Sequence, residues 1–370
     1  MSIEFRVADG SDGPELRRLL RENPLDGDIR VSLEREPDVF FAAKVEGDEH
    51  QTIVAHDRSR GRTIGMGSRS VYSGFLNGRP ARIGYLSQLR LDREYRGRVP
   101  LLSRGYALIR SLRQADAPPF DITTITAGNS AARRLLSAGV DGLPAYQELE
   151  PFTTLAIPTS RRRRSSPPAG IRIERGSTGR LDAIVACLDR NRVRYHFAPR
   201  WTADDLRSPE RSRGLDVRDF LVALREERVI GCLAVWDQSS FKQVVVRGYS
   251  GLMRRTRPLA DLFARVAGAP GLPALGQAMP HLYLSHVAID EDSAEIFDAL
   301  FAAAYNAICA RRRAWLIAGF APRHPFLQAL RKRYRAWSYS TVIYAVCWDD
   351  RCDAIASLDH RIPHLEVGLL

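Results

Sequence analysis

Tyr85-Leu-Ser-Gln-Leu-Arg-Leu-Asp-Arg-Glu-Tyr-Arg-Gly-Arg-Val-Pro-Leu-Leu102 has the pattern of a strand that passes through a charged turn directly into a helix. Such a junction points free backbone N–H groups, and the positive end of the helix dipole, at the space beyond the strand. Pro100 suits the first helical turn, where its missing N–H would have no partner. Residues 90–113 carry a net charge of +5, whereas residues 1–157 as a whole carry +1. We therefore expect an anion site at this turn.

The same residues resemble the pattern L-x-V-x-P-x-Y-R-G-x-G-x-G of the GNAT superfamily, the acyl-CoA-dependent N-acyltransferases. The positions that match in register are Leu89, Leu91, Tyr95, Arg96, Gly97 and Arg98. Val99 and Leu101 replace the two following glycines, and glycine is the residue that lets a backbone approach a diphosphate closely. The resemblance implies that acetyl-CoA or another acyl-CoA is the co-substrate, held by Leu89, Arg90, Leu91, Arg96, Gly97, Arg98, Val99, Leu101 and Leu102.

A second stretch, residues 127–139, is similar to the family pattern N-x-x-A-x-x-L-Y-x-x-x-G, with Asn129, Ala132 and Leu135 aligned. The resemblance implies that Asn129 and Ala132 help to hold the pantetheine arm. Leu136 stands where the family has a tyrosine that protonates the leaving thiolate. The alternative for Asn129 is an ordinary helix cap.

Amide formation from a thioester needs a proton acceptor, stabilisation of the oxyanion and protonation of the leaving group. The resemblance implies that backbone N–H groups at a bulge in the strand over residues 85–91 polarise the carbonyl. Tyr85, Ser87 and Gln88 are our candidates for lining the acceptor site. Tyr146 either replaces the missing tyrosine or is a core tyrosine with one hydrogen bond.

The clearest candidate for a linker between domains is the polar, Arg/Pro/Ser-rich stretch over residues 158–170. We expect a GNAT-like acyl-CoA-binding domain at 1–157, a diverged second GNAT-like domain at 171–350 and a tail at 351–370. The predicted class is α/β (α+β), with a mixed, mostly antiparallel sheet flanked by helices in each half. The order of predicted elements favours two copies of one fold.

In the first half, periodicity predicts strands at 4–8, 39–45, 52–56, 68–75, 79–91, 121–127 and 152–157, and helices at 14–21, 101–114 and 130–138. Asn77-Gly78 favours a tight turn between two of these strands. In the second half, it predicts strands at 171–174, 220–224, 229–236, 244–249, 282–289, 314–318 and 341–348, and helices at 180–189, 258–266, 294–311 and 325–334.

In the second half, the strand over residues 282–289 runs into an acidic stretch, residues 290–295. We expect these acids to cap the next helix and to repel phosphate. The second half is therefore predicted to support the first or to shape the acceptor cleft, with a second catalytic site as the less favoured alternative.

The 370 residues include 45% hydrophobic and 26% charged residues, which is typical of soluble globular proteins. No apolar stretch approaches the 20 or so residues of a membrane helix, and no secretory signal is recognisable. We expect a cytoplasmic location and no membrane partner. The five cysteines lack a C-x-x-C pair, so we expect reduced thiols and no metal.

The net charge of +12 raises the possibility of nucleic-acid binding. Of that charge, +4 lies in residues 158–170 and +7 in residues 171–370, and 52 of the 55 basic residues are arginines. The basic stretch 331–337 is more typical of an amphipathic helix with Tyr334 and Trp337 packed inward. Nucleic acid is therefore the third and least favoured partner.

We expect an N-acyltransferase, and specifically an N-acetyltransferase, that uses acyl-CoA and an amine acceptor. Small amines, amino acids, peptide N-termini and lysine side chains all remain open as acceptors, and the sequence does not indicate an oligomeric state. The alternative is a catalytically weak acyl-CoA-binding or regulatory protein, because Val99, Leu101 and Leu136 depart from the family pattern.

Overall fold

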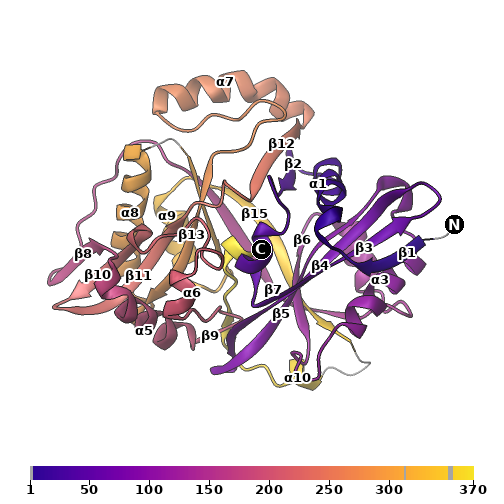
Figure 1. The fold of residues 1–370 in the computed structure, drawn as a ribbon. Helices are drawn as coiled ribbons and strands as arrows, with labels where there is room; N and C mark the ends of the chain where they lie inside the picture. Colours follow the sequence, from indigo (N-terminus) through magenta and orange to yellow (C-terminus); the bar gives the residue numbers. More distant parts are fainter. Residues whose placement is uncertain (1–2, 312–313, 349–352) are drawn as a thin grey trace.

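A sheet of twelve strands runs through the whole molecule in the computed structural model, which describes residues 3–311, 314–348 and 353–370. The strand order is β1-β3-β4-β5-β6-β15-β7-β14-β13-β11-β10-β8 (Figure 1). The strands before residue 159 are β1 (Ile3–Val7), β3 (Glu49–Asp57), β4 (Arg62–Leu76), β5 (Arg79–Leu91), β6 (Asp121–Thr126) and β7 (Ala145–Pro158). Those after it are β8 (Ile171–Arg175), β10 (Phe220–Arg225), β11 (Arg228–Trp236), β13 (His281–Ile289), β14 (Trp315–Phe320) and β15 (Trp337–Cys347).

The two halves of the chain exchange their last strands. β15 lies between β6 and β7 and is antiparallel to both, while β7 pairs with β14 of the second half. In Figure 1 the yellow β15 accordingly runs beside the violet strands of the first half. Residues 158–170 separate the halves in sequence, but β7 and β15 join them in space.

Two neighbouring strand pairs of this sheet are parallel, β5 with β6 and β13 with β14, and the others are antiparallel. The expectation of a mixed, mostly antiparallel sheet with flanking helices is confirmed. Two short ribbons accompany it, β2 (Ile29–Glu34) with β12 (Gln243–Tyr249) and β9 (Tyr195–His196) with β16 (Ile362–Pro363).

Helices cover both faces of the sheet. They are α1 (Gly13–Glu22), α2 (Phe41–Glu46), α3 (Val99–Ser111), α4 (Ser130–Leu136), α5 (Leu181–Arg192), α6 (Ala203–Arg207), α7 (Gly251–Ala267), α8 (Ala294–Arg311), α9 (Pro325–Arg333) and α10 (Asp353–Ala356). Leu16 of α1 packs with Val54, whereas Tyr106 of α3 packs with Ile53. Because successive strand residues point to opposite faces, α1 and α3 lie on opposite sides of the sheet. In the second half, α5 and α8 likewise belong to two separate cores.

Most predicted elements are present, and the tight turn has its expected geometry, with φ of 50° at Asn77 and 70° at Gly78. The strand predicted at 39–45 was wrong, because this segment forms α2 with Ala42 and Val45 buried one turn apart. A short apolar run does not by itself distinguish the two periods. β2 was not predicted, and its partner β12 comes from the other half.

Three further expectations concern single side chains. Tyr334 is buried as predicted, but Trp337 is 43% exposed because it begins β15 instead of ending a helix. Cys347 is disulfide-bonded, so the expectation of reduced thiols was wrong for that residue. Cys352 and the basic residues Arg312 and Arg313 lie outside the described residues. In the described part of the chain, no helix is long and apolar enough to cross a bilayer.

Candidate active site

Strand β5 carries a bulge at Gln88 and Leu89, which together stand opposite Gly67 of β4. The flanking pairs are Ser87 with Ser68 and Arg90 with Met66. Gln88 has a φ of 55°, in the left-handed region that residues other than glycine seldom adopt. A bulge takes backbone groups out of the regular ladder, so the strand can present them to a ligand here.

The bulge lies beyond the end of the pairing between β5 and β6. These two parallel strands pair only at Gly84 with Asp121 and at Tyr85 with Ile122. Past this point Thr123 still reaches β5 through its hydroxyl, which donates to the Leu86 carbonyl at 2.7 Å. The ladder itself ends before Gln88, and this leaves the bulge without a paired strand on that side.

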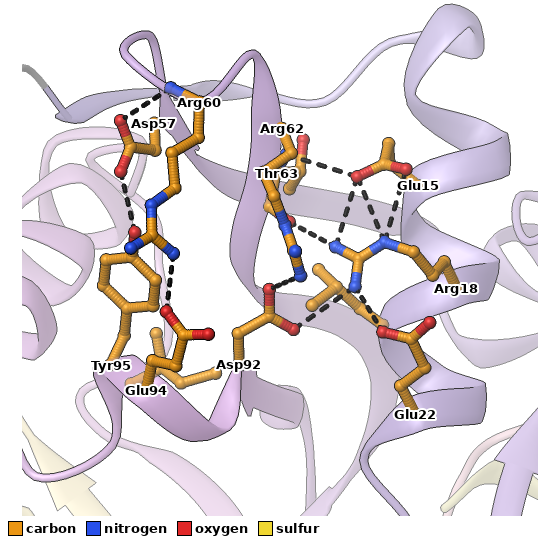
Figure 2. A network of polar contacts seen from close by, with 12 residues as sticks. Glu15, Arg18, Glu22, Asp57, Arg60, Arg62, Thr63, Asp92, Glu94 and Tyr95 are labelled. Atoms are coloured by element: carbon orange, nitrogen blue, oxygen red, sulfur yellow. Dashed lines mark hydrogen bonds and ion pairs between the residues drawn. The ribbon is translucent and has the colours of Figure 1, made fainter.

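A network of ion pairs and hydrogen bonds holds the turn after β5 (Figure 2). Asp92 accepts from Arg62 and, at 3.3 Å, from Arg18. The buried Tyr95 donates its hydroxyl to Asp57 at 2.7 Å. Hydrogen bonds from Ser59 and Tyr95 lower the pKa of Asp57 to about 2, so this carboxylate stays charged at neutral pH. This network pairs the acidic side chains near the turn with partners in the protein and holds the backbone of the turn in place.

The arginines of the turn remain at the surface. Arg93, Arg96 and Arg98 are exposed. Arg96 donates to Asn23 Oδ1 at 2.7 Å, and the Arg98 guanidinium lies 4.8 Å from the centre of the Tyr95 ring. Between them Gly97 has a φ of 76°, a conformation that favours glycine. α3 then begins at Val99 with no side-chain cap, Pro100 has no N–H, and the Leu101 N–H donates to the Arg98 carbonyl at 3.0 Å.

The two residues that replace the family's glycines differ in position. Leu101 is buried with Ile3, Ala55 and Tyr95, so its side chain points into the core. Leu102 likewise packs into the core beneath α3. Val99 is partly buried at the start of the helix.

A small apolar cavity of about 40 Å³ lies under α3 and next to the bulge. Its walls come from β3, β4, β5 and α3, and they include Gly65, Gly67, Leu89, Leu91, Gly105 and Tyr106. A Cβ atom added at Gly67 would meet Leu89 at 3.9 Å, an ordinary contact distance, so the missing side chain at Gly67 contributes to the space.

The second predicted stretch forms the start of α4. Asn129 is its N-cap, and Oδ1 accepts from the Ala132 N–H at 3.1 Å. The capping interpretation of Asn129 is therefore correct for the amide oxygen, and the Nδ2 group takes no part in the cap. Ala132 packs against the same core cluster as Leu136.

Of the two candidate tyrosines, Tyr146 packs against the cluster that contains Leu136, and its hydroxyl lies 2.6 Å from that of Tyr106. Burial raises the pKa of Tyr146 well above its usual value. Tyr85 belongs to a different cluster, and its hydroxyl lies 2.8 Å from Thr124 Oγ1. Burial raises the pKa of Tyr85 to about 12. The structure therefore does not bring the two phenols together.

A row of hydroxyl groups crosses the sheet away from the bulge, on the face that also carries Tyr85. Ser87 pairs with Ser68 across the ladder, and Ser68 Oγ lies 2.8 Å from Thr52 Oγ1. Thr52 Oγ1 lies 3.1 Å from Nε2 of His50. Burial lowers the pKa of His50, so its ring is neutral at pH 7. The Ser87 hydroxyl itself has no hydrogen-bond partner among the described residues.

At the far end of this row lies Glu46, a buried carboxylate that sequence reasoning missed. It is 3.7 Å from His50, 2.5 Å from Arg35 and 3.6 Å from Lys242. Burial acts to raise the pKa of Glu46, but Arg35 and Lys242 outweigh it and the pKa is lowered. Arg35 also contacts the bulge, since Gln88 Oε1 accepts from it at 2.8 Å when the amide is turned toward the guanidinium.

Lys242 reaches this cluster from the loop that precedes β12, in the other half of the chain. It donates to the carbonyls of Gly368 and Leu370, both at 3.0 Å, and burial lowers its pKa to about 8. It is one of three lysines among 55 basic residues. That rarity was the one available signal in the sequence, because Glu46 and Arg35 match no motif.

A second bulge stands at the equivalent place in β13. Ser285 pairs with Ala234 and Ala288 with Cys232, so His286 and Val287 stand opposite Leu233. His286 has a φ of 53°, close to that of Gln88. The tripeptide Tyr-Leu-Ser precedes both bulges, at residues 85–87 and 283–285, a repeat that the sequence analysis overlooked.

Side chains from elsewhere in the protein contact the second bulge and cap its backbone. The His286 N–H donates to Glu366 Oε2 at 3.0 Å, and Arg192 donates to the same oxygen at 2.6 Å. Trp201 and Trp236 enclose the imidazole ring of His286. In the described part of the chain we find no side chain that caps the first bulge in this way.

The turn after β13 is occupied by its own ion pairs. Asp290 accepts from Arg190 at 2.8 Å, and Asp292 accepts from Arg194 at 2.9 Å. The expectation that acids would cap the following helix was wrong, because Ser293 accepts from the first turn of α8 instead. The acids are held by arginines of α5 and of the residues just after it.

Neither protein-family models nor curated protein sequences match the chain. Solved structures do. A GCN5-related N-acetyltransferase from Sphaerobacter thermophilus aligns over 93% of this chain and 95% of its own, with a TM-score of 0.55 and 13% identity. N-myristoyltransferase of Saccharomyces cerevisiae with bound myristoyl-CoA aligns over 93% and 82%, with a TM-score of 0.60 and 12% identity. A GCN5-related glucosamine N-acetyltransferase region of a fungal β-N-acetylglucosaminidase aligns over 93% and 38%, with a TM-score of 0.60 and 14% identity.

The chain has the GNAT fold. The likeness extends over both halves, because each alignment covers 93% of the chain. A strand that carries a bulge and pairs with a parallel neighbour occurs twice, at β5 and at β13. Within the described residues, no group of three or more His, Cys, Asp or Glu side chains could hold a metal ion.

Proposed function

We propose that the first half binds an acyl-CoA and transfers its acyl group to an amine. The observation that carries this proposal is the uncapped bulge at Gln88, which leads directly into an arginine-rich turn and the start of α3. The equivalent bulge at His286 is capped by Glu366 and leads into an acidic turn. The bulge at His286 is thus closed by the chain itself. The bulge at Gln88 is open and lies beside positive charge, which supports acyl-CoA binding there.

In this proposal the diphosphate lies at the turn between β5 and α3. Arg96 and Arg98 supply charge, Gly97 supplies the turn, and the uncapped start of α3 supplies the positive end of the helix dipole. The inward direction of Leu101 and Leu102 supports this assignment despite the loss of the glycines. Asn129 and Ala132, at the start of α4, are proposed to contact the pantetheine arm.

The bulge is proposed to polarise the thioester carbonyl. Backbone N–H groups near Gln88 and Leu89 would donate to the oxygen that gains charge as the amine nitrogen bonds to the carbonyl carbon. The C–S bond then breaks and the sulfur leaves as a thiolate. Leu89, Arg90 and Leu91 form the wall beside the reacting group.

The proton of the attacking amine needs an acceptor, and none of the residues singled out from the sequence is a base. We propose that it passes along the hydrogen-bonded hydroxyls of Ser68 and Thr52 to the neutral ring of His50, beside Glu46, and that Ser87 lines the acceptor site. Tyr146, through its contact with Tyr106, is the proposed proton donor for the thiolate. Tyr85 is assigned to the wall of the acceptor site.

The cavity next to Gly67 is proposed to receive the end of the acyl group. At about 40 Å³ it is a small cavity. This size favours acetyl-CoA over long acyl chains, so N-acetyltransferase is the proposed activity. A cytoplasmic location remains part of the same proposal.

A second candidate function is acyl-CoA binding without efficient transfer. The observation that favours it is the absence of a tyrosine at Leu136, together with the commitment of the Tyr85 and Tyr146 hydroxyls to Thr124 and Tyr106. Nucleic-acid binding rests on the charge of the second half alone.

Calorimetry with acetyl-CoA and a thiol-release assay over small amines, amino acids and peptides distinguish these functions. Saturable binding with thiol release on one class of amine is the expected result. Binding without release would favour the second candidate. Lack of binding, together with salt-dependent retention on DNA or RNA, would favour the third.

A further inference from the structure

Helix α7 exposes its apolar side to the surroundings. Figure 1 shows α7 at the outer edge of the molecule, above the ribbon of β2 and β12. We define the α7 stripe as five exposed apolar side chains, Leu252 (75% exposed), Leu259 (61%), Leu262 (57%), Phe263 (71%) and Val266 (72%). At 3.6 residues per turn these five lie on one side of the helix. Leu275, in the following loop, is 62% exposed and lines the same hollow as Leu262.

The charged side of α7 is the side that holds it to the body. Arg257 forms an ion pair with Asp261 at 3.3 Å and donates to the Leu272 carbonyl at 3.1 Å. Asp261 in turn accepts from the Leu272 N–H at 2.8 Å, and Arg257 lies over the Tyr249 ring. A surface helix normally turns its apolar side to the core. α7 is reversed, so its apolar side is available to something outside the molecule.

The charge around the α7 stripe indicates what that partner is. Arg255 is exposed on the side of the helix that carries the stripe, whereas Arg254 is exposed on the opposite side, where the helix's one acid, Asp261, is paired with Arg257. The sequence of α7 holds four arginines against that one acid, a net charge of +3. An apolar side on a helix that is rich in arginine is the pattern of a helix that lies in the surface of a bilayer. Anionic headgroups complement this charge.

A second copy of the chain fits the α7 stripe less well. A 17-residue helix is about 25 Å long. A stripe of five side chains along it is small against the roughly 1,200 Å² that a stable protein interface buries. A symmetric contact would also bring the exposed arginines of the two copies together, which is unfavourable.

We propose that α7 docks on a lipid bilayer with anionic headgroups. The α7 stripe enters the boundary between headgroups and acyl chains, and Arg255 reaches the headgroup phosphates. The contact is peripheral, since no described helix is long and apolar enough to span a bilayer. It replaces our sequence-based expectation of no membrane partner, and it does not depend on the proposed acyl transfer.

Flotation of the purified protein with large unilamellar vesicles tests the proposal directly. We expect binding to vesicles of phosphatidylcholine with one quarter phosphatidylglycerol, and at least tenfold weaker binding to pure phosphatidylcholine. The double variant L262D/F263D should bind the anionic vesicles at least tenfold more weakly. V7D, which changes an apolar side chain that is 43% exposed on β1, is the matched control and should bind normally. Absence of binding to anionic vesicles, or equal binding by L262D/F263D, would overturn the proposal.

A charge-reversal variant and a mass measurement complete the test. R254E/R255E retains the stripe and should lose the preference for anionic over neutral vesicles. Circular dichroism and thermal unfolding should be unchanged in all variants, because the substituted side chains are exposed. If light scattering instead shows a dimer that L262D/F263D abolishes, the α7 stripe is an interface between copies and the lipid proposal is wrong.

Discussion

The bulges at Gln88 and His286 have nearly the same backbone and opposite surroundings. Both follow the tripeptide Tyr-Leu-Ser, and both lie past the end of a short parallel pairing. Opposite the first stands Gly67, next to a cavity, and opposite the second stands Leu233, fully buried in a core. This fold therefore supplies the bulge, whereas the side chains around it decide whether it is open to a ligand.

The surroundings differ on the other face of the sheet as well. Beside the first bulge, Ser68 continues a row of hydroxyl groups toward His50. The equivalent residue beside the second is Ala234, within an apolar core that also holds Trp236. The second bulge is thus part of a core, and its buried carboxylate, Glu366, stabilises it from within. Four predictions test this contrast.

Substituting Glu366→Gln should destabilise the protein by about 3–5 kcal/mol. Glu366 is paired with Arg192, and both side chains are almost fully buried, so the change leaves a buried charge without its counter-ion. Urea unfolding gives the free energy of unfolding. Glu227→Gln removes an exposed partner of Arg172 and Arg180 and should cost far less. A Glu366→Gln protein as stable as Glu227→Gln would mean that the second bulge is not held by its carboxylate.

The polar cluster beside the first bulge should show itself in the pH dependence of stability. Burial lowers the pKa of Lys242 to about 8 in the fold, from 10.5 when unfolded. Below pH 8 both states carry the proton, and the folded state bears the cost of a buried charge. Between pH 8 and 10.5 the folded state loses the proton first, so stability rises with pH, by up to about 3 kcal/mol.

The measurement is urea unfolding of the wild type and of Lys242→Met from pH 7.5 to 10. The difference between the two curves removes the contribution of other titrating groups. It should grow in favour of the wild type as pH rises. A difference that is constant with pH would show that Lys242 keeps an ordinary pKa.

Substituting Arg96→Ala together with Arg98→Ala should weaken acetyl-CoA binding by up to about a hundredfold. Hydrogen bonds to charged groups contribute about 1.5–3 kcal/mol each, and exposure reduces this value. Calorimetry measures the affinity. The matched control is Arg172→Ala with Arg175→Ala, which removes two exposed arginines from β8 of the second half. Equal affinities of the two double variants would place the diphosphate elsewhere.

Substituting Gly67→Ala should make the first bulge slightly more like the second. The new methyl group enters the cavity at ordinary contact distances, 3.9 Å from Leu89 and 4.0 Å from Ile53. It should lower the affinity for butyryl-CoA relative to acetyl-CoA by about tenfold, since one methylene group in an apolar pocket is worth about 1–3 kcal/mol. Gly128→Ala, where the added Cβ meets nothing within 4 Å, is the control. An unchanged ratio would exclude this cavity as the acyl site.

Much of the local structure followed from short stretches of sequence. Periodicity predicted α8 at residues 294–311, and Asn77-Gly78 predicted the hairpin turn, because these signals depend on neighbours along the chain. The family motif correctly predicted a strand, a turn and a helix at residues 85–102. The helix over residues 41–46 was not predicted, because a short and mostly apolar segment fits either period.

The candidate site was predicted only in part. The sequence pointed to the arginines of the turn and to Ser87 and Gln88, which lie at the bulge. It did not reveal Glu46, Arg35 or Lys242, which come from segments up to 207 residues apart and meet only through tertiary packing. It also gave no warning that Glu366 would cap the second bulge, 80 residues after His286.

Nearest-neighbour preferences and motif spacing were sufficient to fix which segments are strands and helices and where an anion-binding turn begins. The exchange of β7 and β15, the filling of the second bulge and the outward apolar side of α7 were decided in three dimensions. Each depends on which surfaces are left to bury, and on which buried charges find partners, once all the elements have packed together. These features depend on residues that are distant along the chain, so no local sequence pattern predicts them.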